Sequence, residues 1–127
     1  ITYTDKKIVI IGAGRLVGRP VASWFLRENV GFSLITDKTT DLSFYTKDAD
    51  IIISGTGKAN VITGDIIKKD VIIIDAGTSE VGGKIVGDVS ADSVSSKAKF
   101  LTPVPGGVGP LTVMMIFKNL FIVASDE

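Results

Sequence analysis

The stretch that decides the fold is Lys6-Lys7-Ile8-Val9-Ile10-Ile11, which continues as Gly12-Ala13-Gly14-Arg15-Leu16-Val17-Gly18-Arg19-Pro20. The apolar run is rich in β-branched residues and predicts a strand buried on both faces. It ends at three glycines, after which the chain resumes with helical spacing. A strand, a glycine turn and a helix place free N–H groups and the positive end of a helix dipole where the pyrophosphate of a dinucleotide binds.

The spacing of the glycines leaves two interpretations open. The usual fingerprint is GxGxxG, whereas the third glycine here falls one residue later, at Gly18. A glycine-rich turn can also serve only to join a strand tightly to a helix. The stretch therefore predicts either a dinucleotide site or a tight turn, and residues further along the chain must decide between them.

The composition excludes several classes of function. Fourteen Lys and Arg balance 14 Asp and Glu, so we expect neither nucleic acid nor an anionic membrane as a partner. The absence of Cys and His removes disulfides, thiolate chemistry and the commonest metal ligand, and we predict no metal site. No apolar run approaches the ~20 residues of a membrane span, and no signal peptide is present. The first residue is Ile1 rather than Met, which suggests a processed product or a piece of a longer protein. We expect a cytoplasmic location.

Strand-like and helix-like segments alternate along the 127 residues. The patterns predict strands at 32–35, 51–53, 71–74 and 100–101, a hairpin turn at Gly82-Gly83, and helices at 16–29, 42–47, 90–95 and 111–123. The last helix is strongly apolar and is expected to close the fold. We therefore predict one domain of class α/β over residues 1–127, a Rossmann-like, doubly wound and mainly parallel sheet with helices on both faces.

Ligands of such a sheet bind outside the carboxyl ends of its strands. Those ends are rich in glycine and hydroxyl side chains at 12–18, 54–57, 75–78 and in the Pro/Gly loop at 102–110. Each segment alone could be an ordinary turn, but together they favour a binding site.

Acidic residues also follow the strands. Asp37 ends the second strand roughly 20 residues after the glycine turn, where an acid accepts hydrogen bonds from the ribose hydroxyls of NAD. Its alternative role is to start a turn by bonding its own loop. Asp75 and Asp88 could be catalytic carboxylates, although the pattern favours a loop-capping role for both.

Thr102-Pro103-Val104-Pro105-Gly106-Gly107-Val108-Gly109-Pro110-Leu111-Thr112 closely resembles the signature of the methylenetetrahydrofolate dehydrogenase/cyclohydrolase family. Further blocks resemble that family in the same order, and the likeness extends from about Lys7 to Ala124. These blocks are Val17-Gly18-Arg19-Pro20, Ala49-Asp50-Ile51, Gly57, Ile67-Lys68, Ile74-Asp75-Ala76-Gly77 and Val86-Gly87-Asp88-Val89.

The resemblance covers only the family's cofactor domain. It implies hydride transfer from 5,10-methylenetetrahydrofolate to a nicotinamide and hydrolysis of the methenyl product, with the folate bound by an N-terminal domain that has no counterpart here. It also implies a homodimer, and no catalytic residue in this chain. The cofactor-binding residues that we predict from the residues and the resemblance together are Gly12, Ala13, Gly14, Arg15, Leu16, Val17, Gly18, Thr36, Asp37, Thr56, Gly57, Gly77, Thr78, Pro105, Gly109, Pro110 and Thr112.

The chain departs from the family at the adenosine end. The family usually has Gly-Arg-Ser where this chain has Gly12-Ala13-Gly14, and a polar pair often stands at Thr36-Asp37. Because the Arg and Ser help to hold the 2′-phosphate of NADP, the departure favours NAD over NADP. The opposing features are Arg15 and Lys38, either of which could pair with that phosphate. Two other functions stay open: a stand-alone, non-catalytic NAD-binding module, and the cofactor domain of another enzyme such as a shikimate dehydrogenase.

Overall fold

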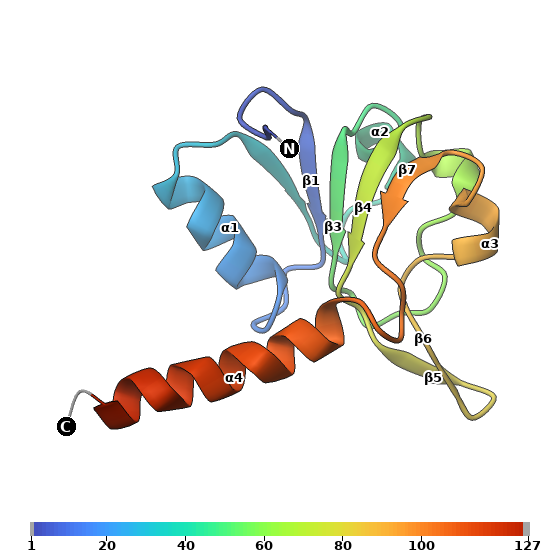
Figure 1. The fold of residues 1–127 in the computed structure, drawn as a ribbon. Helices are drawn as coiled ribbons and strands as arrows, with labels where there is room; N and C mark the ends of the chain where they lie inside the picture. Colours follow the sequence, from blue (N-terminus) through green and yellow to red (C-terminus); the bar gives the residue numbers. More distant parts are fainter. Residues whose placement is uncertain (1, 126–127) are drawn as a thin grey trace.

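A five-stranded parallel sheet forms the centre of the protein (Figure 1). The computed structural model describes residues 2–125. The strands lie in the order β2-β1-β3-β4-β7, and their bounds are β1 Ile8–Ile11, β2 Phe32–Ile35, β3 Ile51–Ser54, β4 Val71–Asp75 and β7 Ala98–Leu101. The chain leaves β1 toward one side and returns for β3 on the other. The point at which the order reverses therefore lies between β1 and β3.

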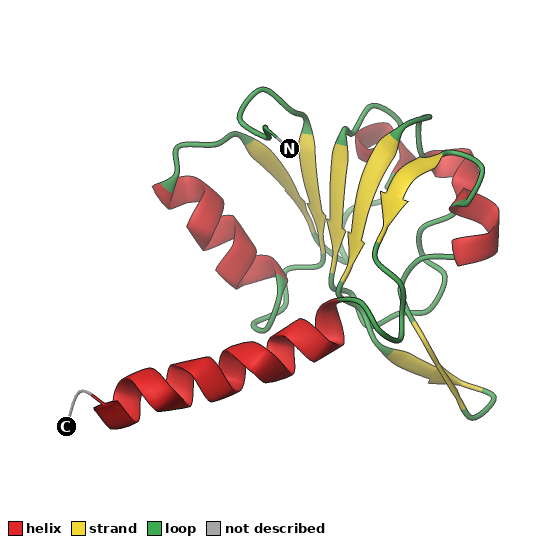
Figure 2. Ribbon diagram, in the orientation of Figure 1, coloured by secondary structure: helices red, strands yellow, loops and turns green. Residues whose placement is uncertain are grey.

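Helical segments cover both faces of the sheet, as the sequence predicts (Figure 2). One face carries α1 (Gly18–Arg27), whereas the other carries α2 (Ser43–Thr46), the 3₁₀ turn η1 (Gly64–Ile66) and α3 (Ala91–Val94). Between β4 and α3 the chain forms an antiparallel hairpin of β5 (Ser79–Val81) and β6 (Lys84–Val86). The expected fold class is confirmed.

Alternate residues of the strands enter two cores. On β1, Ile8 and Ile10 pack with Phe25 of α1, while Val9 and Ile11 pack in the cluster on the opposite face. This division follows from the period of two in an extended chain and explains why the strands are unbroken apolar runs. The first loop of the chain joins the α1 side through the aromatic ring of Tyr3, which lies 6.1 Å from the ring of Phe25.

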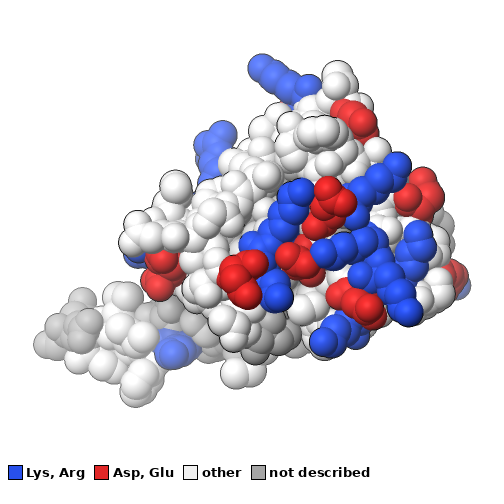
Figure 3. All heavy atoms as spheres, turned by 90° about the horizontal axis from the view of Figure 1, so that it is seen from above, with Lys and Arg blue, Asp and Glu red and all other residues white. Residues whose placement is uncertain are grey.

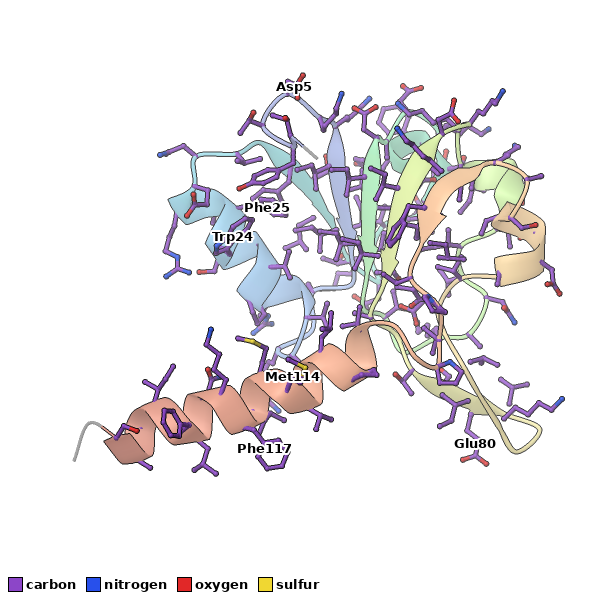
Figure 4. All side chains as sticks on the ribbon, viewed as in Figure 1. Asp5, Trp24, Phe25, Glu80, Met114 and Phe117 are labelled. Atoms are coloured by element: carbon purple, nitrogen blue, oxygen red, sulfur yellow. The ribbon has the colours of Figure 1, made fainter. Side chains whose placement is uncertain are left out.

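The last helix, α4 (Val108–Ser125), does not close the fold, and that expectation was wrong. None of its 18 residues is buried, and Met114 and Phe117 are 66% and 67% exposed. Figure 4 shows Phe117 pointing away from the rest of the chain. Periodicity could not reveal this result because α4 is apolar on all sides, which predicts burial without saying against what.

By length and composition, α4 is also apolar enough to cross a membrane, and in residues 2–125 it is the single helix of which this is true. The expectation that no apolar run approaches that length was therefore wrong. Lys118 and Asn119 interrupt the run in the sequence without ending the helix.

Charged side chains gather at the edge of the molecule formed by the amino ends of the strands (Figure 3). Lys and Asp alternate there, and Lys68 is paired with Asp50, whose second oxygen accepts the Lys7 N–H at 2.8 Å. The pairing lowers the pKa of the Asp50 carboxyl, first through the Lys68 hydrogen bond and then through the Lys7 N–H. This edge is thus a mixed, solvated surface remote from the carboxyl ends of the strands.

Candidate functional site

A cavity of about 750 Å³ opens at the carboxyl ends of β1, β2 and β3, where the strand order reverses. Three loops meet in it: the glycine turn, the turn after β2 and the loop after β3. Six of the predicted residues line it, namely Gly12, Ala13, Gly14, Thr36, Asp37 and Thr56. The cavity therefore unites three of the segments that the sequence predicts to bind a dinucleotide.

The three glycines of the turn have different roles. Gly12 has φ +96°, and a Cβ there would lie 2.7 Å from the carbonyl oxygen of Gly55. A Cβ on Gly18 would overlap the carbonyl oxygen of Gly12, so this glycine allows α1 to approach the strand end. By contrast, the nearest atom to a Cβ on Gly14 would be 3.9 Å away. Gly12 and Gly18 thus serve packing, whereas Gly14 leaves space beside the cavity.

The start of α1 is left without an acidic partner. Its N-cap residue, Val17, has no capping side chain, and no acidic residue occupies the first turn. The Nε of Arg19 donates to the carbonyl oxygen of Ala13 at 3.0 Å, which holds the guanidinium group beside the cavity. A positive helix end and a cation that face one cavity favour an anion.

The turn after β2 is held by threonines rather than by Asp37. The Lys38 N–H donates to Thr36 Oγ1 at 3.3 Å, and the Thr36 N–H donates to Thr39 Oγ1 at 3.4 Å. Asp37 is exposed on the cavity wall, and no hydrogen bond within residues 2–125 uses its carboxylate. The alternative of a turn-starting Asp37 is therefore not what the structure contains.

Asp75 and Asp88 take the loop-capping role that the sequence favours. Asp75, at the end of β4, accepts the N–H groups of Gly77, Asp88 and Val89 at 2.9, 3.2 and 3.0 Å. Burial raises the pKa of the Asp75 carboxyl, and the neighbouring Asp88 carboxylate adds to the rise, whereas the three N–H donors oppose it. Asp88 binds the loop after β3.

Three cations line the cavity wall: Arg19, Lys38 and Lys58. Sequence reasoning raised Lys38, with Arg15, as a partner for a 2′-phosphate, and did not assign Arg19 or Lys58 to the site. Lys38 is adjacent to Asp37, and Arg19 follows the third glycine within the first turn of α1. The signal for Lys58 was its place just after Gly57, in a loop already expected to bind. Together with Asp37 they give the cavity three positive groups and one negative group.

The other predicted residues lie outside this cavity. Leu16 is 93% exposed, and the hydroxyl of Thr112 donates to the Val108 carbonyl oxygen within α4 at 3.1 Å. Gly77 is buried against Asp88, where a Cβ would overlap the carboxylate. The predicted cofactor-binding roles stay predictions for Arg15, Leu16, Val17, Gly18, Gly57, Gly77, Thr78, Pro105, Gly109, Pro110 and Thr112.

Comparison with known proteins adds a family to this geometry. Residues 1–127 match the family described as "Tetrahydrofolate dehydrogenase/cyclohydrolase, NAD(P)-binding domain". The bifunctional protein FolD of Caldanaerobacter subterraneus is 45% identical over 119 residues, and that of Nitratiruptor sp. is 48% identical over 118 residues. These matches cover 94% and 93% of this chain. The chain spans only 42% of the length of either relative.

Solved structures agree with the sequence matches. The crystal structure of the bifunctional methylenetetrahydrofolate dehydrogenase/cyclohydrolase of Campylobacter jejuni matches with a TM-score of 0.90 and 45% identity, over 95% of this chain and 43% of that one. The Trypanosoma brucei enzyme, solved with NADP and an inhibitor, matches with a TM-score of 0.85 and 34% identity, over 94% of this chain and 43% of that one.

Proposed function

Because this chain belongs to the tetrahydrofolate dehydrogenase/cyclohydrolase family, as its NAD(P)-binding domain, we propose that it is the cofactor half of a two-domain enzyme. That enzyme would oxidise 5,10-methylenetetrahydrofolate and hydrolyse the methenyl product to 10-formyltetrahydrofolate. The observation that carries the proposal is the cavity at the strand reversal, which unites the glycine turn, Asp37 and the loop after β3. Family membership also removes the shikimate dehydrogenase alternative.

The residues present fit a dinucleotide. Gly14 leaves open space beside the cavity, and the start of α1 has no acidic residue to repel a pyrophosphate. Gly12 to Gly18 would hold the pyrophosphate, and Asp37 would accept hydrogen bonds from the adenosine ribose. When bound, the nicotinamide supplies the hydride acceptor, while this chain binds and orients it.

We propose NAD rather than NADP as the cofactor. The Asp37 carboxylate is free to accept hydrogen bonds from the ribose hydroxyls. Hydrogen bonds to a charged group contribute roughly 1.5–3 kcal/mol each to binding. Ala13 and Gly14 offer no side-chain donor to a 2′-phosphate. Two observations oppose this choice. Lys38 and Arg19 line the cavity, and either could pair with that phosphate. The relative from T. brucei was also solved with NADP.

The folate is proposed to bind a separate domain that α4 contacts. The chain spans 42% of the length of its relatives, and α4 exposes an apolar surface that no part of residues 2–125 covers. Because the matched segment includes α4, we assign this surface to a protein interface rather than to a membrane. Co-sedimentation of the chain with phosphatidylcholine vesicles would contradict that assignment.

We further propose a homodimer, with the β5–β6 hairpin at its contact. The hairpin projects from the sheet (Figure 1), and Val81 and Ile85 on it are exposed. A two-stranded hairpin is stable only when it packs against something. Multi-angle light scattering should give twice the chain mass, and Ile85→Lys should give the monomer. A monomeric wild type would contradict the proposal.

The cofactor proposal is tested by calorimetric titration of the chain with NAD⁺. We expect weak binding, because the folate-side wall of the cleft is outside this chain and only part of the ligand would be covered.

We also expect no oxidation of methylenetetrahydrofolate by the chain alone, since no His, Cys or folate-binding residue is present to orient the substrate. The absence of both heat and a thermal shift at millimolar NAD⁺ would refute the cofactor role, and turnover by the chain alone would refute the division between two domains.

A further inference from the structure

Two buried carboxylates lie behind the cofactor cavity without a basic partner. Asp75 is 2% exposed and Asp88 is completely buried. Neither forms an ion pair with Lys or Arg in the part of the chain that the structure describes. Removing a carboxylate from water is costly unless hydrogen bonds compensate it, so the surroundings of these two groups must supply such bonds.

Asp88 obtains its hydrogen bonds from the loop after β3. Its Oδ2 accepts the Ser54 hydroxyl at 2.6 Å and the Thr56 N–H at 2.6 Å, and its Oδ1 accepts the Lys58 N–H at 3.2 Å. The three donors are alternate residues of one loop. A single side chain 30 to 34 residues away in sequence therefore determines the path of this loop.

The same loop forms a wall of the cavity and contacts the glycine turn. Gly55, Thr56 and Lys58 line the cavity. The carbonyl oxygen of Gly55 would lie 2.7 Å from a Cβ on Gly12, and a Cβ on Gly55 would lie 2.6 Å from Cβ of Val17. A displacement of the loop would thus change both the width of the cavity and the support of the turn.

Asp75 determines where Asp88 lies. It accepts the N–H groups of Asp88 and of Val89, which follows Asp88, and a Cβ on Gly87 would overlap its carboxylate. In sequence, Asp75 precedes the β5–β6 hairpin and Asp88 follows it. The hydroxyl of Ser79, at the start of β5, donates to the Gly57 carbonyl oxygen at 2.9 Å. The base of the hairpin is therefore joined to the cofactor loop.

We propose that Asp88 is a positioning residue for the cofactor cavity: its carboxylate holds the Ser54–Lys58 loop at the spacing from the glycine turn that a dinucleotide requires. The proposal rests on the proposed function of the cavity. It assigns Asp88 no contact with the cofactor. A neutral side chain of the same shape cannot replace it, because one end of an amide presents N–H groups to the N–H and O–H donors of the loop.

The test compares Asp88→Asn with Val94→Ala. Val94, the last residue of α3, is fully buried in the core and does not line the cavity, so its truncation lowers stability without touching the loop. Both variants are titrated with NAD⁺ at a temperature at which unfolding curves show each to be folded. We expect Asp88→Asn to raise the dissociation constant roughly tenfold to a hundredfold, which is about the effect of losing one hydrogen bond to a charged group. Val94→Ala should leave it within twofold of the wild-type value.

Ser54→Ala provides a milder variant should Asp88→Asn fail to fold. It removes one donor and leaves the two backbone hydrogen bonds of Asp88, so we expect a smaller rise in the dissociation constant, of about twofold to fivefold. An unchanged constant in folded Asp88→Asn would overturn the proposal. So would an equal rise in Val94→Ala, because that result would reflect stability alone.

Amide NMR separates this proposal from the cofactor assignment. In Asp88→Asn the resonances of Thr56, Lys58 and Gly12 should shift with no cofactor present, whereas those of β7 should not. If the wild type binds no NAD⁺, the cofactor proposal fails, and these shifts still decide whether Asp88 positions the loop against the glycine turn. Unmoved resonances of Gly12 would overturn the positioning role in either case.

Discussion

The carbonyl oxygen of Gly12 occupies the position that a Cβ on Gly18 would need. This contact joins the residue that follows β1 to the first residue of α1. We predict that Gly18→Ala destabilises the protein by at least about 2 kcal/mol, because the overlap is with backbone and cannot be relieved by a side-chain rotation. Gly31→Ala is the matched control, since a Cβ there meets nothing within 4 Å and should change stability by less than about 1 kcal/mol. Urea unfolding of both variants measures the difference, and equal stabilities would contradict the packing role.

Gly14→Val should abolish NAD⁺ binding and leave the fold intact. The position has an ordinary φ, and the nearest atom to a Cβ would be 3.9 Å away, so the Cβ of valine meets no clash within the protein. It would instead occupy the space through which the backbone approaches the pyrophosphate. Calorimetry and thermal unfolding are measured on one preparation. A variant that keeps the wild-type affinity would show that the phosphates lie elsewhere.

Asp37 should make the protein prefer NAD⁺ over NADP⁺. A 2′-phosphate would place up to two negative charges beside the carboxylate, which predicts a penalty of roughly one to three decades in affinity. Asp37→Ala should reduce that preference, and Ala13→Arg with Gly14→Ser should improve NADP⁺ binding further by adding donors. The comparison uses dissociation constants of both cofactors for all three proteins. Tighter binding of NADP⁺ by the wild type, unchanged on removing Asp37, would show that Lys38 or Arg19 decides the selectivity.

Replacing apolar residues of α4 should leave the stability of the sheet unchanged. Phe117 and Phe121 are 67% and 74% exposed, so Phe117→Glu with Phe121→Glu removes no buried contact. We expect a change in unfolding free energy below about 0.5 kcal/mol, together with less self-association of the chain. Light scattering over a concentration series and urea unfolding measure the two effects. A large loss of stability would mean that α4 folds back onto the sheet in solution.

Asp75 and Asp50 should affect the pH dependence of stability with opposite signs. The pKa of Asp75 is raised by burial, so its folded-state value lies above the unfolded value of about 3.9. Its contribution to the free energy of unfolding is then largest below about pH 4 and is lost as the pH rises through the folded-state pKa. The pKa of Asp50 is lowered by Lys68, so its contribution is present above about pH 3.9 and is lost as the pH falls through the folded-state value.

Unfolding curves from pH 3 to pH 7 for the wild type, Asp75→Asn and Asp50→Asn measure these two contributions. The stability difference between the wild type and Asp75→Asn should shrink as the pH rises above about 4, whereas the difference for Asp50→Asn should grow as the pH rises toward 4. A difference for Asp75→Asn that grows with pH would contradict the direction of its pKa shift.

The order and type of the elements could be predicted from the sequence because they depend on local properties. The unbroken apolar runs at Ile8–Ile11 and Ile51–Ile53 indicate buried parallel strands, and the glycine turn with Asp37 about 20 residues later indicates where a dinucleotide binds. The Pro/Gly loop at 102–110 is the main basis of the resemblance to the family to which this chain belongs. Each of these signals lies within a short window of sequence.

Only the tertiary structure decided which distant groups meet. The strand order brings the turn after β1 against the loop after β3, and Asp88 reaches Ser54 across 34 residues. Local periodicity carries no information about partners so far apart, because they are selected by how strands pair and how the chain crosses the sheet. The exposure of α4 has the same cause. Its apolar residues predict a buried helix, but the surface that would bury it lies outside its own sequence.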